Sequence, residues 1–368
     1  MSSFTHRRHR RTTRTVHPLA YALATVLTLI GALSIAAPAL AAPPPANSVI
    51  ATIPVGNGAG GIGVDPIRGT VYVANQNYNE GAGTVSVIDE KTDVVTDTIT
   101  VGNYPYQVAV DPLRGVVYVD NYLSESVSVI SEATNTVIDT ISLPGGPAHS
   151  MAIDPRHGLV YVVEGTTLQV ISEKTNTIVD SISIPGDGLE TVGIDPARGL
   201  VYVGEFYGTL LVISEKTNAV VNTIATGFNT YLTGITADSA TGTVYVSTYA
   251  TIGSEQYSGP GDVAVVDENT DAVTDTIPTD GNGPGGIGFD PFNDTLYVAN
   301  YDYESPMTAS VVSVINARNN TLTTTVPVGV GPAGLALDPY RGYVYSANNG
   351  AGGGTSTPGS VSVIKAGL

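Results

Sequence analysis

The string TVYVAN at residues 70–75, followed by TVSVID at 84–89, decides the fold of this chain. Both strings alternate β-branched or aromatic residues with smaller ones, a pattern typical of short β-strands. Before the first string an apolar strand ends in Asp65-Pro66-Ile67-Arg68-Gly69, and after the second the turn EKTD leads into VVTDTI at 94–99. One such unit therefore predicts four consecutive antiparallel strands joined by tight turns and one variable loop.

This unit recurs along the whole chain. The aspartate that closes its first strand stands at Asp65, Asp111, Asp154, Asp195, Asp238, Asp290 and Asp338. Seven four-stranded units at this spacing predict an all-β, seven-bladed β-propeller with four antiparallel strands per blade. We expect the blades over residues 59–99, 105–141, 148–182, 189–224, 231–277, 284–326 and 332–364.

The two ends of the repeat region complete each other. Residues 48–53 (SVIATI) match a fourth strand without its first three, and residues 332–364 supply three strands without a fourth. We therefore expect the N-terminal strand to pair in the last blade, which closes the ring and covers its exposed sheet edges. This predicts one domain over residues 48–364, followed by a tail at 365–368.

Two repeated columns predict packing and turn geometry. One tyrosine per repeat occupies the second strand, where we expect packing between blades in preference to an aromatic cage; these are Tyr72, Tyr118, Tyr161, Tyr202, Tyr245, Tyr297 and Tyr345. Six hairpin residues stand where a left-handed backbone is expected; these are Asp93, Asn135, Asn176, Asn218, Asp271 and Asn320. A third column of small residues, such as Gly63 and Gly193, suits the crowded inner strands.

The repeat strings resemble a known family. TVYVAN (70–75), TVSVID (84–89), SVSVIS (126–131) and TLYVAN (295–300) are similar to the YVTN-type propeller repeat. The resemblance covers residues 48–364. It implies relatives among surface-layer and extracellular binding proteins, and also among lactonases, lyases and quinoprotein dehydrogenase subunits. The repeat therefore implies an architecture without implying one activity.

The first 41 residues predict export. Five arginines between residues 7 and 14 precede the apolar run from Leu19 to Ala37, and Ala39-Leu40-Ala41 matches a cleavage site. The alternative is an uncleaved membrane anchor, because the apolar run is long enough to span a bilayer. We expect a cleaved signal at 1–41, a Pro-rich spacer at 42–47, no further membrane span, and a secreted bacterial monomer that is extracellular or associated with the cell envelope.

Composition excludes several classes of function. The chain has no cysteine, which excludes disulfides, thiolate metal sites and thiol catalysis. Removing residues 1–41 removes five of the 15 basic residues and none of the 33 acidic ones, so the remaining charge is 10 − 33 = −23. Such a surface repels nucleic acid and anionic membranes and favours cations or basic partners.

Strand direction sorts these charges onto two sides. All tight turns fall on one side, here the turn face, and all variable loops fall on the other, the loop face. The ten basic residues after residue 41 map to the turn face, while the loop face receives twelve acids, several tyrosines and no base. We expect a binding face for a cation, glycan or protein at Tyr104, Tyr122, Glu125, Tyr207, Tyr231, Tyr249, Tyr301, Asp302 and Tyr303. The alternative is that repeat duplication copied one turn arginine while the loops stayed acidic and soluble.

One cluster of residue types suggests chemistry. Glu164 and Glu205 replace the Asn or Thr that ends the second strand in other repeats, and His149 and Glu190 begin the inner strands of the same two blades. If they converge, these side chains would hold a divalent cation or perform acid–base work. The alternative is a set of solvated rim residues.

Three functional hypotheses follow from these residues. The first is a non-catalytic binding or scaffold propeller with an acidic, tyrosine-rich loop face and no cofactor. The second is a metal-assisted hydrolase or lyase with a site at the mouth of blades 3 and 4. The third, a quinoprotein redox subunit, is disfavoured because the chain has no cysteine and no tryptophan.

Overall fold

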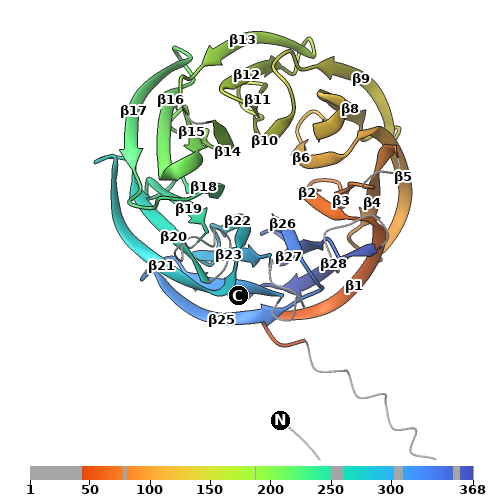
Figure 1. Cartoon of the computed structure of the whole chain (residues 1–368). Coiled ribbons are helices and arrows are strands. Elements are labelled where there is room, and N and C mark those ends of the chain that lie inside the picture. The colour runs from red at the N-terminus through yellow and green to blue at the C-terminus, as the bar shows by residue number, and fades with distance from the viewer. Residues whose placement is uncertain are drawn as a thin grey trace, which may run out of the picture. The chain divides into compact units, whose positions relative to one another are not determined.

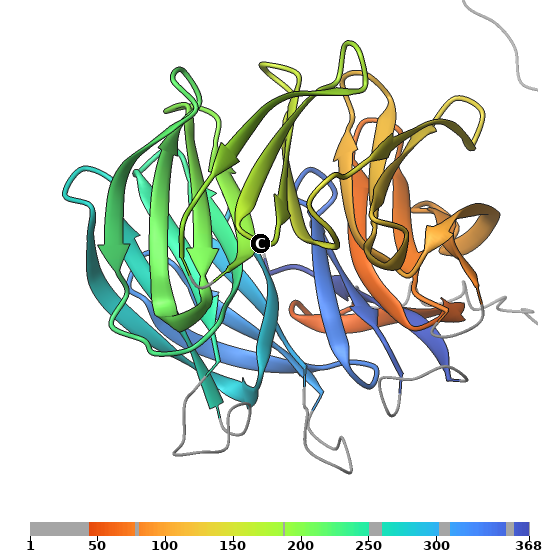
Figure 2. The same cartoon turned by 45° about the horizontal axis from the view of Figure 1, so that its top comes forward.

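The computed structural model describes residues 44–77, 81–186, 188–249, 260–301, 310–350 and 357–367. Residues 44–368 form one compact unit, and in its described part the chain folds into seven four-stranded antiparallel sheets. The sheets stand side by side in a ring (Figure 1), and their strands run between the loop face and the turn face (Figure 2). The prediction of an all-β propeller with seven blades of four strands is confirmed.

Each blade repeats the same four strands from the ring axis outward, apart from two 3-10 turns on the loop face, η1 (Tyr122–Ser124) and η2 (Phe206–Gly208). The inner strands are β2 (Ala59–Asp65), β6 (Pro105–Asp111), β10 (Ala148–Asp154), β14 (Leu189–Asp195), β18 (Leu232–Asp238), β22 (Pro284–Asp290) and β26 (Pro332–Asp338). The second strands are β3 (Thr70–Asn75), β7 (Val116–Asn121), β11 (Leu159–Glu164), β15 (Leu200–Glu205), β19 (Thr243–Thr248), β23 (Thr295–Asn300) and β27 (Tyr343–Asn348). The third strands are β4 (Ala82–Asp89), β8 (Ser126–Ser131), β12 (Thr167–Ser172), β16 (Thr209–Ser214), β20 (Pro260–Asp267), β24 (Val311–Asn316) and β28 (Pro358–Lys365). The outer strands are β5 (Val94–Asn103), β9 (Thr136–Ser142), β13 (Thr177–Ser183), β17 (Ala219–Ala225), β21 (Ala272–Asn282), β25 (Thr321–Pro327) and β1 (Ser48–Asn57).

The first and last strands of the propeller belong to one sheet. β1 pairs antiparallel with β28, with Ser48 opposite Lys365 and Ile53 opposite Val361. The sheet order is β1-β28-β27-β26, so blade 7 contains both ends of the domain. β1 runs on to Asn57, past the predicted end at residue 53.

The turns follow from side-chain chemistry at the aspartate that ends each inner strand. Asp65 Oδ1 accepts hydrogen bonds from the backbone N–H groups of Ile67 (2.7 Å) and Arg68 (2.9 Å), and Gly69 closes the turn at φ +69°. The six predicted left-handed hairpin residues all have φ between +49° and +54°. Both turn predictions are confirmed, because Asp, Asn and Gly tolerate these conformations at low cost.

The core lies between neighbouring blades. Six of the seven repeated tyrosines are less than 2% exposed, and Tyr245 is 3% exposed, which confirms their packing role. Inner-strand glycines let the next blade approach: a Cβ at Gly63 would lie 2.7 Å from Cγ2 of Val110, and one at Gly193 would lie 2.5 Å from Cγ2 of Ile235. Each blade therefore buries its apolar faces against its two neighbours.

An ion bridge on the turn face repeatedly links one blade to the next. In blade 1, Nη1 of Arg68 lies 2.6 Å from Asp65 Oδ2 of its own turn and 2.9 Å from Glu132 Oε2 of blade 2. The same nitrogen donates to the carbonyl of Pro112 in the next turn. Equivalent bridges join Asp111, Arg114 and Glu173; Asp195, Arg198 and Glu268; and Asp338, Arg341 and Glu90. We call each of these an arginine seam.

The two carboxylates of the Arg68 seam have opposite pKa shifts. Burial raises the pKa of Asp65, but hydrogen bonds from Arg68 outweigh it and leave the pKa lowered. Burial raises the pKa of Glu132 to about 8, since Asp65 already holds the shared guanidinium. Where blades 5 and 6 carry Thr241 and Asn293 in place of the arginine, the glutamate position of the next blade holds Ala317 and Ala366. In these six seams the arginine and the glutamate are therefore present or absent together.

No helix in the described ranges is both long and apolar enough to cross a membrane. The predicted signal at residues 1–41 and the start of the predicted spacer lie outside the described residues.

Candidate functional site

Large polar and aromatic side chains gather at the loop-face end of the inner strands of three adjacent blades. The second residue of the inner strand is Tyr106 in blade 2, His149 in blade 3 and Glu190 in blade 4. Blades 1, 6 and 7 have Gly60, Gly285 and Ala333 at this position. The inner strands lie nearest the ring axis (Figure 1). Large side chains therefore line the rim around that axis in blades 2 to 4, whereas glycine or alanine lines it in blades 1, 6 and 7.

Five side chains form a continuous row along the rim of blades 2 to 4. The ring centroids of Tyr104 and Tyr122 are 5.6 Å apart, and both rings lie about 6 Å from Tyr106, at 6.1 and 6.2 Å. Tyr122 also lies 5.5 Å from the imidazole of His149, whose Nδ1 is 3.3 Å from Glu190 Oε2. We call Tyr104, Tyr106, Tyr122, His149 and Glu190 the rim cluster. It extends across blades 2 to 4, with three tyrosine rings at one end and the carboxylate of Glu190 at the other.

Tyr104 occupies a backbone position that holds glycine in four of the six other repeats. Its φ is +55°, and its carbonyl accepts the backbone N–H of Tyr122 at 2.9 Å. The equivalent residues Gly58, Gly283 and Gly331 have φ of +67°, +61° and +66° and accept the matching hydrogen bond. A bulky side chain in this region costs about 1 kcal/mol or more. The ring of Tyr104 is therefore retained at a conformational cost.

Asp120 on β7 is a buried carboxylate without a partner. It is fully buried, and neither oxygen has a hydrogen-bond partner among the described residues. Tyr118 lies two residues earlier on the same face of β7 and packs in the hydrophobic cluster between blades 2 and 3. Asp120 therefore faces the interface between these two blades, which Tyr122 and His149 bridge on the loop face. Burial raises the pKa of Asp120 well above its ordinary value.

We expect Asp120→Ala to stabilise the protein, because Ala74, Ala299 and Ala347 fill the same position in other blades. Relief of an unsatisfied buried group is worth about 1–3 kcal/mol, or a rise in Tm of about 2–5 °C at pH 7. The pKa of Asp120 is raised by folding, so wild-type stability is lost as pH rises above the unfolded pKa of about 4. The advantage of Asp120→Ala should therefore grow from pH 4 to pH 7 in calorimetry. The control is Asp97→Ala on the exposed face of β5; equal shifts in both variants would contradict the prediction.

Glu164 does not join the rim cluster. It is 1% exposed, its Oε2 accepts a hydrogen bond from Gln169 Nε2 at 2.7 Å, and its Oε1 accepts the backbone N–H of Gly145. In four other blades the same position is an Asn whose side chain donates to a serine on the third strand of the blade, as Asn75 does to Ser86 at 3.0 Å. Glu164 and Gln169 thus replace an Asn–Ser pair with its donor and acceptor exchanged.

Glu205 lies at the corresponding strand end in blade 4. A Cβ added at Gly186 would lie 2.5 Å from its Oε1, so its carboxylate packs against the loop that enters the blade. Of the four residues proposed for metal or acid–base chemistry, the structure brings His149 and Glu190 into contact. Glu164 is engaged elsewhere.

The remaining loop-face candidates in the described part of the chain lie in blades 2, 4, 5 and 6. Tyr231 packs edge-on against Phe206 at 4.6 Å, and Tyr207 is 57% exposed at φ +67°. The backbone N–H groups of Tyr249 and Tyr301 donate to the carbonyls of Tyr231 and Gly283, and Glu125 is exposed. Asp302 and Tyr303 lie outside the described residues. Tyr106 and Phe206 were not predicted, although their strand positions match those of His149 and the η1 tyrosine.

The predicted charge division is present in the described part of the chain. All ten basic residues lie in or beside turn-face hairpins; these are Arg68, Lys91, Arg114, Arg156, Lys174, Arg198, Lys216, Arg318, Arg341 and Lys365. Seven of the twelve loop-face acids are described, namely Asp120, Glu125, Glu164, Glu190, Glu205, Asp262 and Asp280. The rim cluster therefore lies on a face where no described lysine or arginine competes for a cation.

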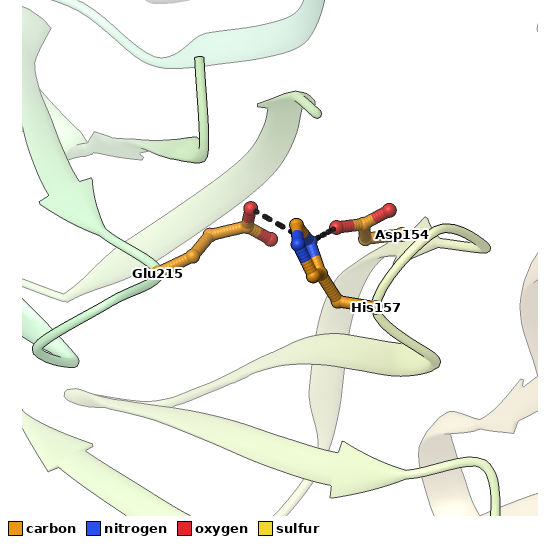
Figure 3. A group of neighbouring side chains, drawn as sticks. All are labelled: Asp154, His157 and Glu215. Carbon is orange, nitrogen blue, oxygen red and sulfur yellow. Dashed lines mark hydrogen bonds and ion pairs between the residues drawn. The ribbon is translucent and has the colours of Figure 1, made fainter. Parts of the chain in front are cut away.

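The turn face holds one group of ionisable side chains that sequence reasoning missed. Asp154, His157 and Glu215 each direct a ligand atom to a common point, with the atoms within 4.8 Å of one another (Figure 3). His157 was placed in its turn from the sequence, but Glu215 comes from the hairpin of the following blade. The signal that could have found it is the paired presence of arginine and glutamate at the other seams.

Comparisons with known proteins identify the fold. No protein-family model matches the chain, and no curated protein sequence matches it either. Among solved structures, a hydrazine synthase chain from Kuenenia stuttgartiensis superposes with a TM-score of 0.68 at 20% sequence identity, over 85% of this chain and 96% of that one. At this identity the likeness supports the propeller fold alone.

Proposed function

We propose that this chain is a secreted YVTN-type propeller that binds a cationic group of a partner molecule at the rim cluster, without turnover. The observation that carries the proposal is Tyr104, which keeps an aromatic ring at a backbone position suited to glycine. Residues in strained backbone conformations are concentrated at functional sites. Export rests on residues 1–41, and the family rests on the repeat strings.

The chemistry of the rim cluster favours a cation. Three tyrosine rings within about 6 Å of one another offer π-faces that attract ammonium or guanidinium groups. Glu190 adds a carboxylate that is 27% exposed at the end of the row. The net charge of −23 after residue 41 would also draw a basic partner toward the protein at low salt.

We expect Tyr104→Gly to weaken binding of an octa-arginine peptide by about tenfold while the Tm changes by less than about 2 °C. Glycine removes the ring but fits the left-handed backbone, so folding and binding are separated in one variant. Binding is measured by calorimetry and by tyrosine emission, which no tryptophan obscures.

Tyr340→Ala is the matched control, because Tyr340 is a 77% exposed tyrosine on the turn face. It should bind the peptide as the wild type does. Equal affinity of wild type and Tyr104→Gly, or binding of neutral oligosaccharides with no binding of octa-arginine, would contradict the proposal.

The His149–Glu190 contact favours one other function, acid–base hydrolysis. A carboxylate 3.3 Å from an imidazole can orient it for proton transfer. Turnover of a panel of lactones that is abolished by His149→Ala would replace the binding proposal with this one.

A further inference from the structure

One of the five charged seams has a histidine where the others have an arginine. In blade 3 the turn reads Asp154-Pro155-Arg156-His157-Gly158, and His157 stands at the position of Arg68, Arg114, Arg198 and Arg341. In the arginine seams one side chain both pairs with the two carboxylates and donates to a carbonyl of the next turn, whereas in blade 3 two residues share these contacts. Arg156 Nη1 donates to the carbonyl of Pro196 in the next turn at 3.1 Å, while His157 faces the two carboxylates.

Replacing arginine by histidine removes both charge and hydrogen-bond donors from this seam. A guanidinium is always charged and carries two hydrogens on the shared nitrogen, whereas one imidazole nitrogen carries at most one. His157 Nδ1 lies 2.5 Å from Asp154 Oδ2 and 3.6 Å from Glu215 Oε2. Glu215 Oε2 is buried and has no hydrogen-bond partner among the described residues.

Each arginine seam sets a permanently charged guanidinium against its two carboxylates. The histidine seam has an imidazole in that place, beside an aspartate side chain that is fully buried and a glutamate side chain that is 6% exposed. Buried carboxylates need a compensating cation.

The two carboxylates are held with one oxygen toward the common point. Asp154 Oδ1 accepts the backbone N–H of Arg156 at 2.8 Å, and Glu215 Oε1 accepts the hydroxyl of Tyr161 at 3.1 Å. These bonds fix the ligands from behind and leave Oδ2 and Oε2 facing His157 (Figure 3). The imidazole side chain is 51% exposed, so solvent reaches the group.

We propose that Asp154, His157 and Glu215 form a site for a first-row divalent transition metal, with Zn²⁺ preferred, that ties blade 3 to blade 4. One nitrogen and two carboxylate oxygens suit Zn²⁺, whereas Mg²⁺ and Ca²⁺ take oxygen ligands. Ligand atoms of a tetrahedral zinc site lie about 3.3 Å apart. The separations of His157 Nδ1 from Asp154 Oδ2 (2.5 Å) and from Glu215 Oε2 (3.6 Å) bracket this value, and all three ligand atoms lie within 4.8 Å of one another. The exposed side leaves a fourth position for water.

The test is Zn²⁺ binding to the purified full chain after treatment with a chelator. We expect about one Zn²⁺ per chain by calorimetry and elemental analysis, and a Tm rise of about 3–5 °C at a Zn²⁺ concentration 100 times Kd. Mg²⁺ at the same concentration should leave the Tm unchanged.

His157→Arg is the decisive control, because it rebuilds the arginine seam of four other blades and should fold at least as stably as the metal-free wild type. It should lose Zn²⁺ binding, while His149→Ala, which changes only the rim cluster, should retain it. Equal Zn²⁺ stabilisation of wild type and His157→Arg, or no Zn²⁺ bound by the wild type, would overturn the proposal. Neither result bears on the loop-face binding site, which octa-arginine probes separately.

Discussion

Deletion of residues 47–55 is expected to lower the Tm of the protein by roughly 10 °C or more and to cause aggregation. These residues supply most of β1, the outer strand of blade 7. Ile53 is 3% exposed and packs in one cluster with Ala347 and Val361. Without β1, the backbone groups of β28 form an open sheet edge beside exposed apolar residues, which is a template for pairing between chains.

Calorimetry and size-exclusion chromatography measure this effect, with deletion of residues 44–46, which precede β1, as the control. A synthetic peptide of residues 47–57 should restore a monomer, because an added strand can complete an open sheet. An unchanged Tm together with monomeric elution of the 47–55 deletion would show that β1 does not hold the ring.

Much of the fold could be predicted because its determinants are local and are repeated seven times. Asp65 meets the N–H groups of its own turn, and Asp93 takes a left-handed backbone within its own hairpin. One such turn would be weak grounds for a prediction, but seven copies of the same turn, 41 to 52 residues apart, leave few alternatives to a propeller. The inward tyrosine follows from period-two alternation in the same way.

The candidate sites were less predictable, because they depend on contacts between blades. His149 and Glu190 were expected together since they hold equivalent positions in adjacent blades. The partners of Glu164, Gln169 and Gly145, could not be predicted, because they depend on strand register and on the direction of one side chain. The meeting of His157 with Glu215 depends on which hairpin of blade 4 approaches the turn of blade 3.

The Asp120 position shows a third limit. Its residue type could be read from the sequence as a departure from Ala74 and Ala347, but whether its carboxylate had a partner could not. Burial without a partner is a property of the packed seam. Departures from the repeat at Tyr104, Asp120 and His157 nevertheless mark three places where the blades are not interchangeable.

Arg114→Ala is expected to destabilise the protein by about 3–5 kcal/mol, a fall in Tm of about 5–8 °C, because it removes the cation shared by two buried carboxylates. Asp111 and Glu173 have side chains only 0% and 1% exposed, and Arg114 Nη1 lies 2.6 and 3.0 Å from them. The loss arises mainly from the uncompensated charges that remain, since the arginine itself is 40% exposed.

A double variant, Arg114→Thr with Glu173→Ala, separates that cost from the value of the bridge. It copies the seam of blades 5 and 6, where Thr241 Oγ1 donates to Asp238 Oδ2 at 2.6 Å and Ala317 replaces the glutamate. We therefore expect the double variant to recover most of the lost stability and to lie within about 1–2 kcal/mol of the wild type, so that the two substitutions are strongly non-additive. Denaturant unfolding of the wild type, Arg114→Ala, Glu173→Ala and the double variant measures this coupling. If the double variant is as unstable as Arg114→Ala, the seam contributes through the bridge itself, and the paired loss of arginine and glutamate in blades 5 and 6 needs another physical cause.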